Sequence, residues 1–412
     1  MSLLWAVTDG LMAAGAILLG LRLVLLVCCS AWDVLRRWRA PGPSEPPNDE
    51  PWPALTVLIP AFNEERVLAG TVRSVAASDY PDLRVLVIDD GSCDGTLAVA
   101  QALALEDPRV ELVAQQPNQG KAAALNAGLA RTQTAVVISL DADTLLVRDS
   151  LKRLALPVML GADACSSNIE VGNRSGWLTH WQSVEYVLGL NLTRRAQATI
   201  GCITTIPGAA AAFRAEALRA VGGWSGDTRT EDTDLTLTML QAGQRVVYEP
   251  RARALTEAPE TIAGLLRQRT RWMHGYLACI WKHRRAFLRA DSLGWFGMPN
   301  LLLLHLLIFP LFMASLPAML RVVEWTSPGA VLAFLVGYLW LDTALAFACY
   351  LVDRKPVGEA AWTPIWRLAW PFFLLAVFFR TWARVITRRD VPWEKADRVG
   401  ALADRASHAS QP

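Results

Sequence analysis

Four short segments of the chain carry side chains that could bind a nucleotide, a metal ion or a reacting hydroxyl group. The first is IDDGSCDGT (residues 88–96), in which Asp89 and Asp90 end an apolar run and a Gly-Ser turn follows. Their carboxylates could accept hydrogen bonds from a base or a ribose. The segment could equally form an Asx turn that caps the next helix. This segment alone does not decide between the two.

A second pair of carboxylates follows another apolar run. Asp141 and Asp143 flank one small residue in SLDADT (139–144). Two carboxylates spaced i, i+2 in a loop can both face one divalent cation, because such cations prefer oxygen ligands. The D-x-D pattern is common in proteins, so alone it is weak evidence for a metal site.

A third acidic segment is RTEDTDLTLTML (229–240). Here Thr230 could cap a helix whose first turn holds Glu231 and Asp232, an arrangement that the helix dipole favours. That purely structural role fits the pattern well. The functional alternative is that Asp232 acts as a general base, taking a proton from a reacting group.

The fourth segment is basic and aromatic. In LLRQRTRWMHG (265–275), Gln268, Arg271 and Trp272 lie on a helical stretch. Arg271 could clamp a diphosphate and Trp272 could stack on a sugar ring. The competing interpretation is a basic helix that lies at a membrane surface.

Regular secondary structure must position these side chains, and the chain from about residue 54 to 293 has the pattern of an α/β domain. Strands are expected at 54–60, 84–90, 110–115 and 135–140, and helices at 64–77, 95–106 and 120–131. Continuous apolar strands separated by helices predict a parallel sheet that is buried on both faces. Such sheets bind ligands at the carboxyl ends of their strands, where the acidic segments fall.

The composition points to a membrane protein. Of the 412 residues, 53% are hydrophobic and only 19% are charged. This balance is typical of chains with membrane spans and opposite to that of disordered chains. The formal net charge is only +2, so no global field indicates a nucleic acid partner. The seven cysteines form no C-x-x-C pair, which predicts neither a disulfide framework nor a zinc site.

The apolar residues are concentrated near the two ends of the chain. Residues 11–29 are long enough to span a bilayer, and Arg36, Arg37 and Arg39 follow them. This order predicts an uncleaved anchor, with the N-terminus outside the cell and the next domain in the cytoplasm. Two or three further spans are expected in the later apolar runs, at 298–320, 328–352 and 362–386.

The number of later spans depends on Pro371. Three later spans would place the basic tail outside, although Arg388, Arg389, Lys395 and Arg398 should stay inside. If residues 358–370 instead lay along the interface, the conflict would disappear. Trp362, Trp366 and Trp370 would then form an aromatic belt. Within the apolar segments, His305 and Asp342 could face a polar path or make helix contacts.

Together and in this order, the four segments resemble the D, D, D, QxxRW signature of the processive family-2 glycosyltransferases, which include cellulose, chitin and hyaluronan synthases. The 35 residues between Asp232 and Gln268 match that family's spacing. IPAFNEE (59–65), NQGKAAALNAG (118–128) and PGAAAAFRAEALRAVGGW (207–224) resemble its nucleotide loop, its lysine loop and its acceptor-side segment. TEDTDLTLTMLQAG and APETIAGLLRQRTRW resemble the bacterial poly-β-1,6-N-acetylglucosamine synthase branch.

The resemblance implies a GT-A (Rossmann-like) α/β catalytic domain in the cytoplasm combined with α-helical transmembrane segments in the plasma membrane. It implies an inverting enzyme that polymerises a β-linked polysaccharide from a UDP-sugar, with UDP-N-acetylglucosamine favoured, and exports the product. Asp232 would be the catalytic base, and Asp141 and Asp143 would hold Mg²⁺ or Mn²⁺. Glu231 and Trp272 would bind the acceptor. The implied nucleotide-sugar-binding residues are Glu64, Asp89, Asp90, Lys121, Asp141, Gln268 and Arg271.

The implied partners are the UDP-sugar donor, the growing polysaccharide, the lipid bilayer and a possible small accessory membrane subunit, with no nucleic acid. One alternative is a non-processive membrane transferase that adds a single sugar to a lipid or glycan, and another is a hyaluronan-, chitin- or glucan-type synthase. A transporter or scaffold with a degenerate catalytic domain is a third. The expected division is an anchor (1–35), a proline-rich linker (36–53), the GT-A domain (54–260), an interfacial helix segment (261–297), membrane or interfacial helices (298–386) and a tail (387–412).

Overall fold

The apolar runs between residues 55 and 140 form four neighbouring parallel strands. In the computed structural model, which describes residues 2–46 and 50–387, these strands are β1 (Leu55–Ala61), β2 (Leu83–Asp90), β3 (Val110–Gln115) and β4 (Val136–Leu140). They lie in the order β3-β2-β1-β4. The register aligns Ala61 with Asp89, so β1 and β2 end at the same edge of the sheet. The prediction of a parallel sheet is confirmed for these strands.

The rest of the sheet is mixed, which the sequence pattern did not predict. It consists of β7 (Ala210–Arg214), β6 (Ala164–Val171), β8 (Val246–Thr256) and β5 (Thr144–Leu146), in that order beyond β4. Strand β7 pairs antiparallel with both of its neighbours, and β6 pairs parallel with β8. Strand β6 is buried at every position although it contains Ser166, Ser167, Asn168 and Glu170. A hydrophobic pattern therefore cannot reveal it.

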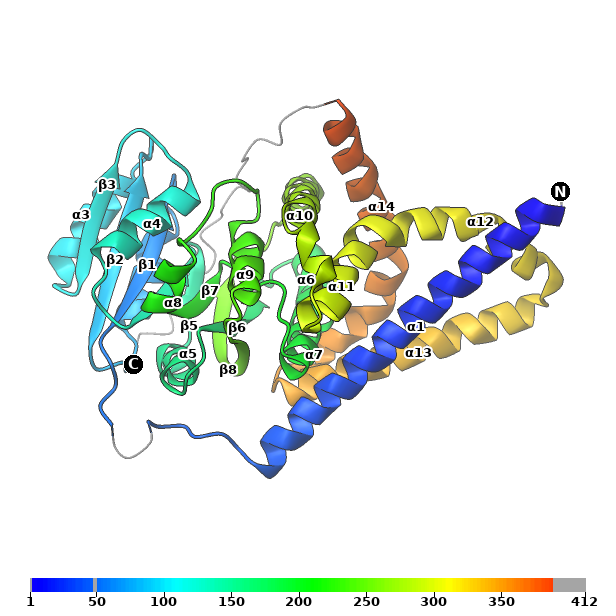
Figure 1. The fold of residues 1–412 in the computed structure, drawn as a ribbon, viewed down its shortest axis with the longest axis horizontal. Helices are drawn as coiled ribbons and strands as arrows, with labels where there is room; N and C mark the ends of the chain where they lie inside the picture. Colours follow the sequence, from blue (N-terminus) through cyan, green and yellow to red (C-terminus); the bar gives the residue numbers. More distant parts are fainter. Residues whose placement is uncertain (1, 47–49, 388–412) are drawn as a thin grey trace.

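Helices cover both faces of the sheet, as Figure 1 shows. Successive residues of β1 face opposite helix layers, so Val57 packs in one apolar cluster and Leu58 in the other. The predicted helix at 64–77 begins later, at Leu68, because the carbonyl of Glu64 accepts the first backbone hydrogen bonds. The covering helices are α2 (Leu68–Ala76), α3 (Thr96–Glu106), α4 (Lys121–Arg131), α5 (Ser150–Met159), α8 (Ala215–Ala220) and α9 (Glu231–Gln241).

Four segments are long and apolar enough to cross a membrane, counted within the described parts of the chain. They are Trp5–Arg39, Leu293–Glu324, Pro328–Val352 and Val357–Ile386. They contain α1 (Ser2–Arg39), α11 (Met298–Leu302), α12 (Ile308–Trp325), α13 (Pro328–Val352) and α14 (Thr363–Ile386). In Figure 1, α1, α12 and α13 project away from the sheet domain, whereas α14 runs along its edge beside α10 (Ile262–Lys282).

The helix α14 continues through Pro371, so the expected break at this proline does not occur. Trp366 and Trp370 are buried, and the Trp370 ring lies edge-on to Trp181 of α6 (Trp177–Glu185), 5.3 Å away. In the alternative of an interfacial segment 358–370 with an aromatic belt, these two rings would have been expected at the interface, but they face the protein. They instead fasten α14 to the sheet domain.

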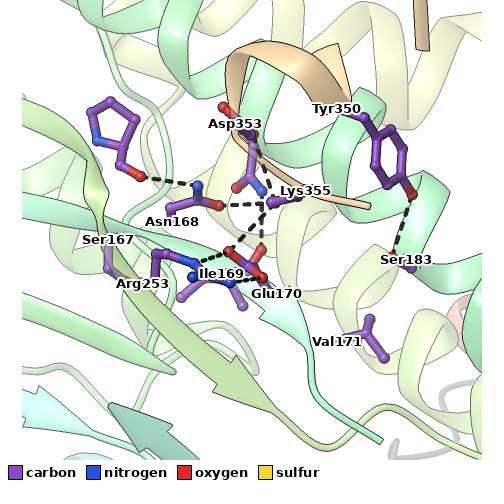
Figure 2. Close-up of polar contacts among 12 residues, drawn as sticks. Ser167, Asn168, Ile169, Glu170, Val171, Ser183, Arg253, Tyr350, Asp353 and Lys355 are labelled. Carbon is purple, nitrogen blue, oxygen red and sulfur yellow. Dashed lines mark hydrogen bonds and ion pairs between the residues drawn. The ribbon is translucent and has the colours of Figure 1, made fainter. Parts of the chain in front are cut away.

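A buried ionic network joins the sheet to the loop after α13 (Figure 2). The ammonium of Lys355 lies 3.3 Å from the amide oxygen of Asn168 and 3.6 Å from a carboxylate oxygen of Asp353. The neighbouring Glu170 accepts a 2.7 Å hydrogen bond from Arg253 of β8. Buried charge pairs of this kind add little net stability but become costly when one partner is removed. The network therefore fixes where the α13–α14 loop meets β6.

The same network reaches α1 through α7 (Leu192–Ile200). Arg195 donates to Asp353 at 2.8 Å and to Asp33 of α1 at 3.0 Å. A separate pair joins α13 to α14, since Arg367 donates to Asp342 at 2.8 Å. Asp342 thus makes a helix contact. The membrane-type helices are consequently tied to the sheet domain and to one another by charged side chains.

Candidate active site

A cavity of about 720 Å³ opens over the carboxyl ends of β1, β2 and β4, and we name it the first cavity. It contains all but one of the residues that the sequence assigned to the nucleotide sugar. The exception is Asp89. The predicted residues that line it are Glu64, Asp90, Lys121, Asp141, Asp143, Glu231, Gln268 and Arg271.

Asp90 holds the loop that presents Lys121. Its two carboxylate oxygens accept hydrogen bonds from the backbone amides of Gln119 and Gly120, each at 2.8 Å. Gly120 has a φ of +91°, in the left-handed region that favours glycine. Helix α4 begins at the next residue, Lys121. Asp90 therefore shapes the first cavity through the backbone as well as lining it.

Asp89 is buried and does not line the first cavity. One of its oxygens accepts a hydrogen bond from the amide of Ser92 at 3.4 Å, and the other has no hydrogen-bond partner among the described residues. The Asx turn before α3 is formed by Asp94, which accepts a hydrogen bond from the Thr96 amide at 3.0 Å. Of the two roles open to this segment, Asp94 takes the structural one, and Asp90 alone of the Asp89–Asp90 pair reaches the cavity.

Lys121 bridges two acidic motifs. Its ammonium lies 2.7 Å from Asp141 and 2.9 Å from Glu231. Burial works against the charged ammonium, but the two carboxylates outweigh it and raise the pKa of Lys121 above its usual range. Lys121 thus stays cationic and joins the D-x-D loop to the first turn of α9.

Asp141 and Asp143 are suited to a divalent cation that also binds a phosphate. Both side chains line the first cavity, and their oxygens are the ligand type that Mg²⁺ and Mn²⁺ prefer. Within the described ranges, no cluster of three or more His, Cys, Asp or Glu side chains could hold a metal ion. The cation site at Asp141 and Asp143 therefore stays a prediction.

Asp232 lies in the first turn of α9 and is held from two sides. Its carboxylate accepts hydrogen bonds from the amides of Thr233 at 2.7 Å and Gly208 at 3.2 Å. Burial and the charge of Glu231 raise the pKa of Asp232 to about 6, against the opposing effect of Lys121. A carboxylate with a pKa near neutrality is well matched to general base catalysis.

Thr230 stands at the N-cap position of α9, but its side chain makes no capping hydrogen bond. The predicted side-chain cap is therefore absent. The hydroxyl of Thr230 lies 3.5 Å from the sulfur of Cys279 on α10. The two helices approach closely at Gly275, where an added Cβ would lie 2.5 Å from the Thr230 side chain. This contact brings the Q-x-x-R-W segment of α10 next to the acidic turn of α9.

A second cavity, of about 290 Å³, adjoins the first and contains Asp232, Trp272 and Tyr276. Asp232 lines this second cavity and not the first. A group that reacts with Asp232 on one side and with a diphosphate compound on the other would therefore lie at the boundary. The residues that line both cavities are Lys121, Asp141, Asp143, Arg229, Glu231, Gln268 and Arg271.

Trp272 is held in place by a cation. The guanidinium of Arg269 lies 4.1 Å from the centre of the Trp272 ring, and Arg269 is itself paired with Glu185 at 2.6 Å. Both charged partners are buried. A cation over the face of an indole attracts it electrostatically. The ring thus has a fixed orientation in the wall of the second cavity, as a stacking platform requires.

The second cavity extends to residues of a candidate membrane span. Asn300 and His305 line it, and both belong to the segment Leu293–Glu324. The His305 ring stacks on Tyr276 with 4.0 Å between centroids, and Asn300 accepts a 2.8 Å hydrogen bond from Arg22 of α1. Of the two ionisable membrane residues noted in the sequence, His305 lines the second cavity, whereas Asp342 lines neither of the two cavities and is paired with Arg367.

Several residues that line the second cavity were not among the site residues predicted from the sequence. Arg229 directly precedes the acidic motif, so its neighbourhood could have revealed it. The other residues belong to no motif that the sequence analysis recognised. Two π-helical turns, Tyr186–Asn191 and Leu303–Leu307, supply part of this lining, and such turns are frequent at functional sites. The lining residues outside the predicted set include Tyr186, Arg194, Thr205, Arg229, Tyr276 and Asn300.

Comparison with known proteins identifies the family. Residues 53–275 match the family described as glycosyltransferase-like family 2, which is more than half of the chain. The chain belongs to glycosyltransferase family 2. This glycosyltransferase is 37% identical over 246 residues to a Mesorhizobium japonicum protein named N-acetylglucosaminyltransferase, covering 56% of this chain and 58% of that one.

A second relative is the poly-β-1,6-N-acetyl-D-glucosamine synthase of Staphylococcus epidermidis. It is 32% identical over 225 residues, covering 54% of each chain. The glycosyltransferase thus matches just over half the length of these curated relatives. The recognition of the family from the four motifs is confirmed.

A solved structure supports the fold. The mannosyltransferase of Pyrobaculum calidifontis, determined with GDP-Man and Mn²⁺, has a TM-score of 0.63 and 21% identity, covering 92% of this chain and 99% of that one. At this identity the likeness concerns the fold. The GT-A fold predicted for the glycosyltransferase, with apolar helices around it, is confirmed.

Proposed function

We propose that this glycosyltransferase transfers N-acetylglucosamine from UDP-N-acetylglucosamine to the end of a β-linked polysaccharide and exports the growing chain across the membrane. The observation that carries the proposal is the path of the two cavities. They share their boundary residues, and the second leads from Asp232 to Asn300 and His305 of a candidate membrane span. The names of the two curated relatives support this donor sugar.

In this proposal the first cavity binds the donor. Glu64 and Asp90 lie on the nucleotide side, and Lys121 and Arg271 place positive charge beside the diphosphate. Asp141 and Asp143 would hold a divalent cation, and this ion would supply the Lewis acidity that offsets negative charge on the departing UDP.

Asp232 then takes the proton of the acceptor hydroxyl. The acceptor oxygen forms a bond to the anomeric carbon from the face opposite UDP, and the bond from that carbon to the phosphate oxygen breaks. One displacement inverts the configuration, so an α-linked donor gives a β-linked product. Trp272 stacks on the terminal sugar of the acceptor.

Export follows from the position of the second cavity. A sugar chain that crosses hydrocarbon without polar partners is strongly disfavoured. The polar side chains of Tyr276, Asn300 and His305 offer such partners where the second cavity meets the membrane segment. The lengthened polysaccharide would therefore move from Asp232 directly into a path between the helices of the protein.

The orientation that we propose has three crossings, made by α1, the segment Leu293–Glu324 and α13. The N-terminus then lies outside, the GT-A domain lies in the cytoplasm, and α14 lies along the cytoplasmic face with Phe372 and Phe379 exposed toward lipid. The packing of α14 on α6 and α10 supports this. A cysteine introduced at Thr387 should react with an impermeant maleimide only after the cells are opened, and labelling of intact cells would contradict it.

Product sizing tests the proposed reaction. Purified protein in detergent is incubated with UDP-N-acetylglucosamine, Mg²⁺ or Mn²⁺ and a short β-1,6-linked acceptor. We expect a ladder of products that lengthens with time. If only single-sugar adducts accumulated on a lipid or glycan, the protein would be a non-processive transferase. A parallel screen of UDP release with other UDP-sugars tests the choice of donor.

A further inference from the structure

Two neighbouring arginines on α7 are buried equally but partnered differently. Arg194 is 5% exposed and Arg195 is 6% exposed. Arg195 binds the carboxylates of Asp33 and Asp353 at 3.0 Å and 2.8 Å. Arg194 forms no ion pair with any residue that the structure describes. Its Nη1 donates to two uncharged oxygens, the carbonyl of Ser167 at 3.2 Å and the side-chain oxygen of Asn191 at 3.1 Å.

The guanidinium of Arg194 therefore retains donors for a ligand. Its Nε and Nη2 donate no hydrogen bond within the described parts of the chain, although buried polar groups are nearly always hydrogen-bonded. Burial lowers the pKa of Arg194, but an arginine stays protonated in proteins. Nε and Nη2 form a planar fork that can bind two oxygens at once.

Arg194 faces the place where the acceptor must lie. It lines the second cavity together with Asp232, Tyr186 and Tyr276. Its side chain is fixed in advance, because Ser167 belongs to β6 and Asn191 donates to the carbonyl of Ile169 at 3.0 Å. A pre-positioned donor pair next to the base can orient the hydroxyl that attacks.

The charges of the second cavity indicate an uncharged ligand. Five carboxylates line it against four permanently charged cations, before a diphosphate is added. An anionic acceptor would be repelled by these carboxylates. A neutral sugar offers hydroxyl and acetamido oxygens, which a guanidinium binds well. The carboxylates are Asp141, Asp143, Glu231, Asp232 and Glu257, and the cations are Lys121, Arg194, Arg229 and Arg271.

We infer that Arg194 is an acceptor-binding residue, which donates from Nε and Nη2 to hydroxyl or acetamido oxygens of an uncharged acceptor sugar and so places its attacking hydroxyl at Asp232. This inference rests on the proposed function, because it assumes that the second cavity binds the acceptor.

The test compares Arg194→Met and Arg194→Lys with the matched control Arg195→Met. Each variant is purified in detergent, and its rate is measured against the concentration of a β-1,6-linked N-acetylglucosamine trimer at saturating UDP-N-acetylglucosamine. Arg194→Met should raise the acceptor KM by about tenfold or more, which is the loss of one charged hydrogen bond of roughly 1.4 kcal/mol. The donor KM, and the slow UDP release without acceptor, should change less than about twofold, since a lost hydrogen bond acts only on the ligand that it binds.

Arg194→Lys should recover part of the acceptor affinity, whereas Arg195→Met should lower the melting temperature with an acceptor KM close to that of the wild type. A merely structural Arg194 would instead behave like Arg195, with a lower melting temperature and an unchanged acceptor KM, and that result would overturn the inference. An equal rise of donor and acceptor KM would overturn it too.

Further acceptors distinguish the oxygen that is bound. If Arg194→Met leaves the KM for a glucose trimer unchanged, the acetamido oxygen is the partner of Arg194. If it raises that KM as much as the KM for the N-acetylglucosamine trimer, the hydroxyl groups are the partners. Either result supports the inference. A penalty seen only with a polyprenyl phosphate acceptor would overturn it, because the partner would then be anionic. If the wild type elongated none of these acceptors, the proposed function itself would be wrong, whatever the variants did.

Discussion

The first cavity is lined mainly by side chains from a few short motifs. The second shares some of these residues with the first and draws the rest of its lining from separate segments between Ile169 and His305. The motifs of the first cavity follow consecutive parallel strands, and the ends of such strands meet at one edge of a sheet. The second cavity is assembled from β6, α7, α10 and a membrane-type helix. The lining of the first cavity, where we propose that the donor binds, is therefore encoded locally in the sequence. The lining of the second cavity, where we propose that the acceptor binds, depends on tertiary contacts.

The two cavities also differ in how their charges are held. In the first, Lys121 is paired with carboxylates of two separate motifs. In the second, Arg194 has only uncharged partners within the described residues. A paired cation organises its own site, whereas a cation with spare donors is available to a ligand. Variants on the two sides should consequently change different kinetic constants.

The largest effect is expected at the boundary, from Asp232→Asn. An amide cannot take the proton, so kcat should fall by about 10²- to 10⁴-fold while the donor KM stays within a few-fold of the wild type. The measurement is UDP release with a saturating oligosaccharide acceptor, alongside a melting curve that checks folding. A folded variant that kept more than about a tenth of wild-type kcat would exclude Asp232 as the base.

On the donor side, Lys121→Met removes the cation that bridges Asp141 and Glu231. The two carboxylates are left without it beside a diphosphate, so the donor KM should rise by about 10- to 100-fold, the range expected for a lost charged hydrogen bond. Titration of UDP-N-acetylglucosamine at fixed acceptor measures this. The acceptor KM should move little. A comparable shift in both constants would show that the two cavities do not act separately.

The pH dependence concerns the base at the boundary. Because its carboxyl pKa is raised to about 6, Asp232 is protonated and inactive as a base below that pH. The rate kcat should therefore fall about tenfold for each pH unit below 6 and level off above it. Initial rates between pH 4.5 and 8 measure the profile. The residual rate of Asp232→Asn provides the control and should lack this step.

A smaller effect on catalysis is expected from the network behind β6. Lys355→Met leaves Glu170 and Asp353 with fewer buried partners and should destabilise the protein by about 3 kcal/mol. Thermal unfolding in detergent measures this loss. The donor KM should stay constant, since Lys355 does not line the first cavity. A donor KM that rose with the loss of stability would mean that the network also shapes the donor side.

Most of the residues predicted for the nucleotide sugar line the first cavity, and the sequence could bring them together because their geometry is local. The strand that ends at Asp90 and the strand before Asp141 lie on either side of β1. Both strands, and the lysine loop at Lys121, could be located from apolar runs and the turns after them. What the motifs could not tell was that Asp90 would bind the lysine loop through backbone amides while Asp89 would stay out of the cavity. That distinction depends on which face of the strand end each carboxylate occupies.

The acceptor side could not be predicted in the same way. Half of the residues of strand β6 are polar, and these side chains are buried only through tertiary contacts. Arg194 and Arg195 are adjacent arginines that the sequence does not distinguish. Only the fold places the carboxylates of Asp33 and Asp353 beside Arg195. Hydropathy cannot decide whether α14 crosses the membrane or lies along its face as we propose, because residues that cover a protein surface and residues that face lipid look alike in composition.

The most direct test of a site that runs from donor to membrane uses proteoliposomes with the GT-A domain facing outward. Labelled UDP-N-acetylglucosamine is added outside, and the product is sized before and after treatment with a polysaccharide hydrolase that cannot enter the vesicles. We predict long chains inside the vesicles that resist the hydrolase until detergent is added. Products of a single added sugar, or long chains fully degraded without detergent, would contradict the proposed path.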